Sequence, residues 1–256
     1  VTRVSIGVQS FDDAELSQMG RLHSARQAYG AVSAALAAGF SVSADFIFGL
    51  PYQSFANWGR TLREAVRCGL SHISLYQLSL EEGTPWASLD RDTLGDGYAA
   101  YRWAQWYLPR KGYRQYEVAN FARQGCESRH NINYWREGES LGAGPGAAGY
   151  LAGLRYKNFG SLRRWAAALA DGELPVAESE QLPFERSARE AAVLALRMTS
   201  GLDRREFAER YGRQALDSLS ASLQKFPRDL YEDDERGIRL TKKGMRVANL
   251  IWAELV

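Results

Sequence analysis

Asp45 and Gln9 are the first candidates for chemistry. Asp45 interrupts an otherwise apolar strand just before Gly49, and Gln9 occupies the equivalent late position in an earlier strand. A carboxylate in an apolar strand needs a partner, so Asp45 is either half of a structural ion pair or an acceptor for a ligand hydroxyl or amine. The amide of Gln9 both donates and accepts hydrogen bonds, which suits a ribose or an amino-acid group. Parallel α/β folds bind ligands at the carboxyl ends of strands.

His130 is the third candidate, in a segment that reads Ser128-Arg129-His130-Asn131-Ile132-Asn133-Tyr134-Trp135 and is expected to be a loop. His130 could ligate haem iron, with Tyr134 and Trp135 as a flat apolar wall for the porphyrin. The alternative is a histidine whose ring is satisfied by local hydrogen bonds. Cys126 is close in sequence, but two ligands do not define a metal site.

Residues 144–149, Gly-Pro-Gly-Ala-Ala-Gly, match the G-x-G-x-x-G pattern of dinucleotide-binding loops. That pattern binds a dinucleotide only between a strand and a helix, and residues 136–140 make a poor central strand. We therefore predict a tight loop that allows close backbone approach.

Three strands are predicted to position these side chains, at residues 3–10, 41–48 and 72–78. A helical pattern lies between each pair of consecutive strands. The first helix is expected to be capped by Ser24 and to end at Gly39, and the second to be capped by Ser54 and to end at Gly69. The alternation of strands and helices implies parallel pairing through right-handed crossovers.

One face of these strands is apolar and suits packing under helices. The other face carries small and polar side chains, namely Ser5, Gln9, Ser43, Asp45 and Ser74. Parallel strands buried on both faces usually read as continuous apolar runs, so this pattern favours a barrel or half-barrel lined for a polar ligand. An antiparallel sheet wetted on one side is the alternative, and the intervening helices argue against it.

The rest of the chain begins with an aromatic helix at 95–108, which is assigned to the core, a strand-like stretch at 113–118 and a loop-rich segment at 120–149. A separate unit starts at about Pro183, with helices at 185–198, 203–211 and 213–226, a hairpin at 230–241 and a terminal helix. Helices followed by a short hairpin resemble a winged helix. Because the hairpin mixes acidic and basic residues, we expect no nucleic-acid partner.

Composition narrows the class further. The 256 residues are 45% hydrophobic and 24% charged, with a net charge of +2, which gives no electrostatic case for nucleic acid. No apolar run approaches the ~20 residues of a membrane span and no signal peptide is found, so a cytoplasmic location is expected. Cys68 and Cys126 can make neither a disulfide framework nor a cysteine-only metal site. Because Val1 opens directly into a strand, we expect a fragment of a longer protein.

Several motifs occur together in order. They are residues 5–11 (SIGVQSF), 20–24 (GRLHS), 45–51 (DFIFGLP), 72–78 (HISLYQL), 82–85 (EGTP), 115–117 (QYE) and 130–135 (HNINYW). This set resembles the HemW family, radical-SAM haem chaperones related to oxygen-independent coproporphyrinogen III oxidase, where SAM is S-adenosylmethionine. The element H-N-x-x-Y-W favours HemW over the oxidase.

The resemblance implies an α/β fold. Residues 1–118 would form strands four to six of a partial (βα)6 radical-SAM barrel with the following helix. Residues 119–182 would form a loop-rich extension, and residues 183–256 a small winged-helix-like α+β domain of the HemN C-terminal type.

The resemblance also implies ligands and partners. It implies S-adenosylmethionine contacts at Gln9, Arg21 and Asp45, with further contacts near Ser79 and Ala148. It implies haem binding by His130, Asn131, Tyr134 and Trp135, with the His130 ring as the iron ligand. The expected partner is a haem-acceptor protein, which can be membrane-associated.

Two departures from the family pattern matter. The C-x3-C-x2-C motif that holds the [4Fe–4S] cluster and the glycine-rich element of the second strand are absent, and both are expected upstream of Val1, in the full-length protein. The family loop reads G-P-G-A-H, whereas Ala148 stands here in place of the histidine, which puts that contact in doubt.

Two other functions remain as alternatives. One is a porphyrinogen-decarboxylating oxidase that abstracts hydrogen through a 5′-deoxyadenosyl radical. The other is a DNA-binding regulator that acts through the winged-helix-like tail.

Overall fold

The computed structural model describes residues 1–80, 82–83 and 86–255, and the chain divides into two compact units, Val1–Glu127 and Ser128–Val256. Thr84 and Pro85, the end of one sequence motif, lie outside the described residues. Within the described part of the chain, no helix is both long and apolar enough to cross a bilayer.

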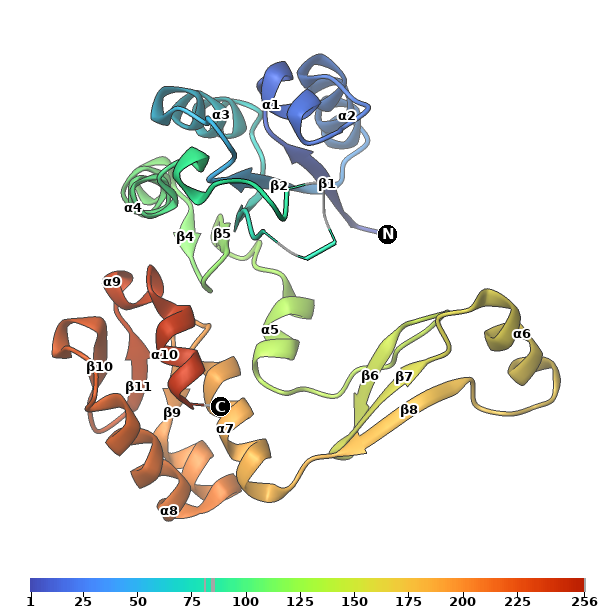
Figure 1. Cartoon of the computed structure of the whole chain (residues 1–256), viewed down its shortest axis with the longest axis vertical. Coiled ribbons are helices and arrows are strands. Elements are labelled where there is room, and N and C mark those ends of the chain that lie inside the picture. Colours follow the sequence, from blue (N-terminus) through green and yellow to red (C-terminus); the bar gives the residue numbers. More distant parts are fainter. Residues whose placement is uncertain (81, 84–85, 256) are drawn as a thin grey trace. The chain divides into compact units, whose positions relative to one another are not determined.

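A five-stranded sheet forms the centre of the first unit (Figure 1). In spatial order its strands are β1 (Arg3–Gln9), β2 (Ser41–Phe48), β3 (His72–Gln77), β5 (Asn120–Ala122) and β4 (Arg114–Gln115). The first three strands pair in parallel, as predicted, and β5 pairs antiparallel with β3 and β4. The strand predicted at 113–118 is therefore only partly right, because the backbone turns back after β4 through a hydrogen bond from Tyr116 N to Asn120 O.

Helices α1 (Asp13–Gln18), α2 (Ala25–Ala37) and α3 (Phe55–Arg67) lie on one side of β1 and β2 (Figure 1). The predicted caps are confirmed: the hydroxyls of Ser24 and Ser54 accept from backbone N–H groups of α2 and α3. Gly39 and Gly69 follow these helices with φ of 81° and 73°, which is the left-handed conformation that glycine adopts without steric cost.

The apolar core lies between the sheet and these helices. On α3, Trp58, Leu62 and Ala65 recur at helical spacing and are buried. The Trp58 ring packs on Phe48 of β2 at 5.4 Å between centroids, and its indole N–H donates to Ala100 O at 3.0 Å. The apolar strand face is thus covered, which leaves the polar face on the opposite side of the sheet.

Helix α4 (Gly97–Tyr107) stands between two short 3-10 turns, η1 (Arg91–Thr93) and η2 (Leu108–Lys111). The assignment of its aromatic residues to the core is right for Tyr101, which stacks on Phe48. It is wrong for Tyr98 and Trp106, which are 44% and 52% exposed. A helix packed on one side buries only the side chains of that face.

The first unit extends to Glu127, past the predicted domain boundary at residue 118, because β5 pairs with β3 in the central sheet. The second unit begins with a short helix, α5 (Arg129–Trp135). The expectation of a loop at His130 is therefore wrong. Ser128 caps this helix by accepting from Asn131 N, so a single serine suffices to start one helical turn.

The segment predicted as a loop-rich extension contains regular structure. Strands β6 (Ala148–Leu151), β7 (Leu154–Asn158) and β8 (Val176–Gln181) form an antiparallel sheet, and α6 (Leu162–Ala170) connects the last two. A tight turn at Gly153, with φ of 82°, joins β6 to β7.

The C-terminal part follows the predicted order of helices, hairpin and helix. Its elements are α7 (Phe184–Ala195), β9 (Leu202–Asp203), α8 (Arg204–Leu223), η3 (Arg228–Leu230), β10 (Tyr231–Asp233), β11 (Gly237–Leu240), α9 (Lys242–Met245) and α10 (Ala248–Leu255). Gly212, with φ of 81° and ψ of 158°, breaks α8 at the point between the two predicted helices. The hairpin joins β9 in a three-stranded sheet of order β10-β11-β9.

Candidate functional site

Asp45 lies on the polar face of the first sheet, next to Ser5. The two residues sit on neighbouring parallel strands, and the Ser5 hydroxyl is 3.2 Å from both carboxylate oxygens of Asp45. Asp45 is half-buried and makes no ion pair with any described residue. A carboxylate held by one hydroxyl keeps acceptor capacity for a further ligand hydroxyl or amine, so its setting favours the ligand-acceptor interpretation.

Gln9 ends β1 in a left-handed conformation, with φ of 65°. Its pairing with β2 is irregular between Ile6 and Gln9, which marks a bulge. The Gln9 amide nitrogen lies 2.7 Å from the point that a Cβ on Gly7 would occupy, so the side chain folds back over Gly7. A side chain at position 7 would have to displace this amide, so Gln9 lies on the face of Ser5 and Gly7.

A buried polar chain crosses the same sheet nearer the start of the strands. The Ser43 hydroxyl is 2.7 Å from His72 Nδ1, and Nε2 of the same ring is 2.9 Å from the Tyr116 hydroxyl. Burial and the Arg3 guanidinium lower the pKa of His72 to about 3, so the ring is neutral. Sequence reasoning assigned no role to this histidine, because its partners come from distant segments.

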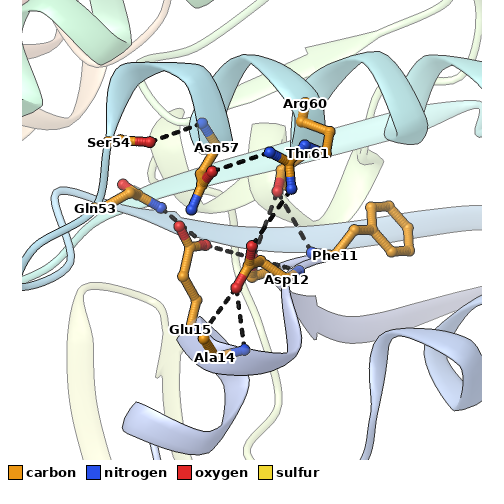
Figure 2. A network of polar contacts seen from close by, with 10 residues as sticks. Phe11, Asp12, Ala14, Glu15, Gln53, Ser54, Asn57, Arg60 and Thr61 are labelled. Carbon is orange, nitrogen blue, oxygen red and sulfur yellow. Dashed lines mark hydrogen bonds and ion pairs between the residues drawn. The ribbon is translucent and has the colours of Figure 1, made fainter.

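A second polar network joins the turns that follow β1 and β2 (Figure 2). The carboxylate of Glu15, on α1, accepts from the Ser10 hydroxyl at 2.5 Å and from the Gln53 amide at 3.1 Å. Burial raises the pKa of Glu15, and the side chains of Ser10, Gln53 and Asn57 act against that rise. Nothing in the sequence distinguishes this glutamate from a solvated helix residue, so sequence reasoning missed it.

Two further residues expected near the cofactor lie in loops of the first unit. Arg21 is exposed between α1 and α2, where its backbone N–H donates to Leu16 O. Ser79 is exposed just after β3.

His130 and Tyr134 lie one turn apart on α5 and form an exposed pair. Their ring centroids are 4.8 Å apart with an interplanar angle of 72°, an edge-to-face contact. Among the described residues, neither ring nitrogen of His130 has a hydrogen-bond partner. An imidazole with an unoccupied ring nitrogen can coordinate haem iron, and the adjacent aromatic ring can pack against the porphyrin.

Trp135 is separated from that pair, which corrects the expectation of one flat wall made with Tyr134. Five residues after His130, it points to a different side of α5, because successive residues turn by about 100°. The Arg197 guanidinium stacks 4.2 Å from its ring, and Trp135 lines a cavity of 440 Å³ with Met198 and Phe207. Trp135 therefore packs within the second unit.

The glycine-rich loop is a tight turn, as predicted, and leads into strand β6 instead of a helix. Asn158 Nδ2 donates to the carbonyls of Gly142 and Gly144, both at 3.0 Å, and thereby holds the loop. Ala148 is exposed at the start of β6. It belongs to the second unit, whereas Gln9 and Asp45 belong to the first.

The cysteines do not form a metal centre. Cys68 and Cys126 are free thiols, and no described residues group three metal-ligating side chains. Burial and Glu64 raise the pKa of Cys68 to about 11, so this thiol stays protonated and is a poor ligand. These residues do not fit an iron–sulfur cluster.

Known proteins resemble the chain in sequence. It is 31% identical to the heme chaperone HemW of Bacillus subtilis, over 98% of this chain and 69% of that protein. It is 34% identical to the heme chaperone HemW of Lactococcus lactis, over 100% of this chain and 69% of that protein. The mitochondrial radical S-adenosyl methionine domain-containing protein 1 of Bos taurus is 45% identical over 58% of this chain and 35% of its own length. The HemN C-terminal domain family matches residues 183–247.

One solved structure shares the fold. Coproporphyrinogen III oxidase (HemN) from Escherichia coli, described as a radical SAM enzyme, superposes with a TM-score of 0.79 at 19% identity, over 99% of this chain and 64% of that chain. The fold is therefore that of a radical-SAM protein, with part of the barrel and a C-terminal domain. The sequence identities of 31% and 34%, each over 69% of a bacterial relative, show more than a shared fold. The chain belongs to the heme chaperone HemW family.

Proposed function

We propose that this chain is the haem-binding and cofactor-binding part of a haem chaperone. The observation that carries the proposal is the exposed His130 imidazole, which has no hydrogen-bond partner among the described residues and lies beside Tyr134. The HemW relatives, each described as a heme chaperone, support it. In this proposal His130 ligates the iron, Tyr134 contacts the porphyrin edge, and Asn131 and Trp135 hold α5 in place.

Haem titration followed in the Soret band tests this assignment. Binding to the wild-type chain should saturate, and His130→Ala should shift the band or weaken binding, because an axial ligand is lost. His23→Ala is the matched control, since its Nε2 lies 3.3 Å from Val8 O in the first unit. A His130→Ala spectrum and affinity equal to those of the wild type would remove the ligand assignment.

For S-adenosylmethionine, the proposal assigns the polar face of the first sheet. Asp45 would accept from ligand hydroxyl or amine groups, Gln9 would bind through its amide, and Arg21 and Ser79 would contribute from the adjacent loops. Two observations support this assignment. Among the residues that the structure describes, the Asp45 carboxylate is held only by the Ser5 hydroxyl and can accept further hydrogen bonds, and the bulge turns Gln9 onto the same face. Bound S-adenosylmethionine would supply a sulfonium that a [4Fe–4S] cluster can reduce, and the cluster would be held by cysteines outside this chain.

The proposed activity is transfer of haem to an acceptor protein. A transfer assay would mix the haem-loaded chain with an apo-haem protein and follow the spectrum of the acceptor. Conversion of coproporphyrinogen III by the reconstituted full-length protein would instead favour the oxidase.

Charge on the hairpin argues against the DNA-binding alternative. Arg239 pairs with Glu232 at 2.5 Å and with Asp234 at 3.0 Å, and Arg204 pairs with Asp233. Because arginines that neutralise acidic neighbours are not free for phosphate, the hairpin is a poor match for a nucleic-acid backbone. Salt-dependent binding to duplex DNA would contradict this reasoning.

A further inference from the structure

Glu15 is a buried acid that the proposed binding of haem and cofactor does not use. It lies on α1 and is 5% exposed, although helix glutamates are rarely buried. Its Oε1 atom makes no hydrogen bond to a described residue, whereas Oε2 accepts from both Ser10 and Gln53. Burying a carboxylate is costly, so the two bonds to Oε2 offset part of that cost only while Ser10 and Gln53 keep their places.

The two bonds of Glu15 connect the turn after β1 to the turn after β2 (Figure 2). On one side Ser10, the residue after Gln9, donates to Oε2, and the Ser10 hydroxyl also accepts from Asp12 N. On the other side Gln53 donates to Oε2 through Nε2, and its Oε1 accepts from Gly49 N at 2.8 Å. A continuous chain of hydrogen bonds therefore runs from the end of β1 to the end of β2.

A second, weaker set of contacts runs beside this connection. The Arg60 guanidinium, on α3, pairs with Asp12 at 3.6 Å and donates to Asn57 at 3.2 Å, while the hydroxyl of Thr61 accepts from Phe11 N at 3.4 Å. The Arg60 side chain is 57% exposed, so its pair with Asp12 adds little, whereas the bond from Ser10 to Glu15 is buried.

We propose that Glu15 is a positioning residue for the cofactor site: through Ser10 and Gln53 it fixes the spacing of the strand ends that carry Gln9 and Asp45. The inference rests on the assignment of S-adenosylmethionine to this face. Gln9 sits in a left-handed conformation one residue before Ser10, so the Ser10 bond holds the bulge that turns its side chain inward. Gly49 lies four residues after Asp45, and its backbone N–H is held by the Gln53 side chain, the other partner of Glu15.

The test is calorimetric titration of S-adenosylmethionine into the chain and its variants. Glu15→Ala should weaken binding by roughly tenfold, by analogy with the lower end of the loss that follows removal of residues orienting metal ligands. Glu15→Gln should bind within about twofold of the wild type, because its amide oxygen can accept the same two bonds. Gln53→Ala, which leaves α1 intact, should also weaken binding and should remove the hydrogen-exchange protection of the Gly49 amide.

Tyr113→Phe is the control for general loss of stability. The Tyr113 side chain is fully buried in the same unit and its hydroxyl donates to Leu70 O at 2.7 Å, before β3 begins and away from both turns. It should lower the melting temperature yet leave the affinity for S-adenosylmethionine unchanged. Equal weakening by Tyr113→Phe and Glu15→Ala would overturn the positioning role.

Asp45→Ala, which removes the acceptor oxygens altogether, separates failure of the inference from failure of the assigned site. If Asp45→Ala abolishes binding while Glu15→Ala and Gln53→Ala bind like the wild type, the positioning role is wrong and the site stands. If Asp45→Ala binds like the wild type, the site is misassigned and the positioning role falls with it.

Discussion

Acidification should destabilise the first unit through His72. Its imidazole is 2% exposed, and burial, followed by the Arg3 guanidinium, lowers its pKa from 6.5 to about 3. In the unfolded chain the ring titrates near its usual value, so between these two pKa values the unfolded state binds a proton that the folded state does not. The stability that the neutral ring confers is complete above pH 6.5 and is lost as the pH falls towards 3.

The size of the effect follows from this difference in pKa. Between pH 7 and pH 5 the unfolded ring changes from mostly neutral to almost fully charged, while the folded ring stays neutral. The free energy of unfolding should therefore drop by about 2 kcal/mol over this interval, out of roughly 5 kcal/mol across the whole shift.

Urea denaturation followed by tryptophan fluorescence measures this contribution. His72→Gln removes the titrating group, so the difference in unfolding free energy between wild type and variant should shrink by about 2 kcal/mol from pH 7 to pH 5. A difference between wild type and His72→Gln that is the same at both pH values would refute a neutral, buried His72.

Three substitutions test the packing that positions the sites. Ser24→Ala removes the capping box of α2 and should cost about 1 kcal/mol of unfolding free energy in denaturant titrations. Trp58→Ala empties a site that is 1% exposed and should cost about 3–5 kcal/mol, measured the same way, or leave the chain unfolded on circular dichroism. Gly244→Ala would place a Cβ 1.9 Å from Leu230 O, so calorimetry should show a melting temperature well below that of the wild type, whereas an unchanged value would mean that the backbone shifts freely.

Local pattern predicted much of the fold. The alternation of side chains gave the three parallel strands, and the serine caps with Gly39 and Gly69 gave the limits of α2 and α3. These features depend on residues a few positions apart, so the sequence contains the whole interaction. The same holds for the break at Gly212 and for the tight turn of the glycine-rich loop.

Tertiary contacts decided the details of the candidate sites. The helix at His130, the inward turn of Gln9 and the burial of Glu15 depend on partners that the local pattern does not reveal. Glu15 has the residue type of a solvated helix position, and its bond to Gln53 joins segments 38 residues apart. Sequence by itself determined the three parallel strands with their helices, the order of the C-terminal elements and the family they resemble. The tertiary structure decided which polar side chains meet, because long-range packing sets their distances and their exposure to water.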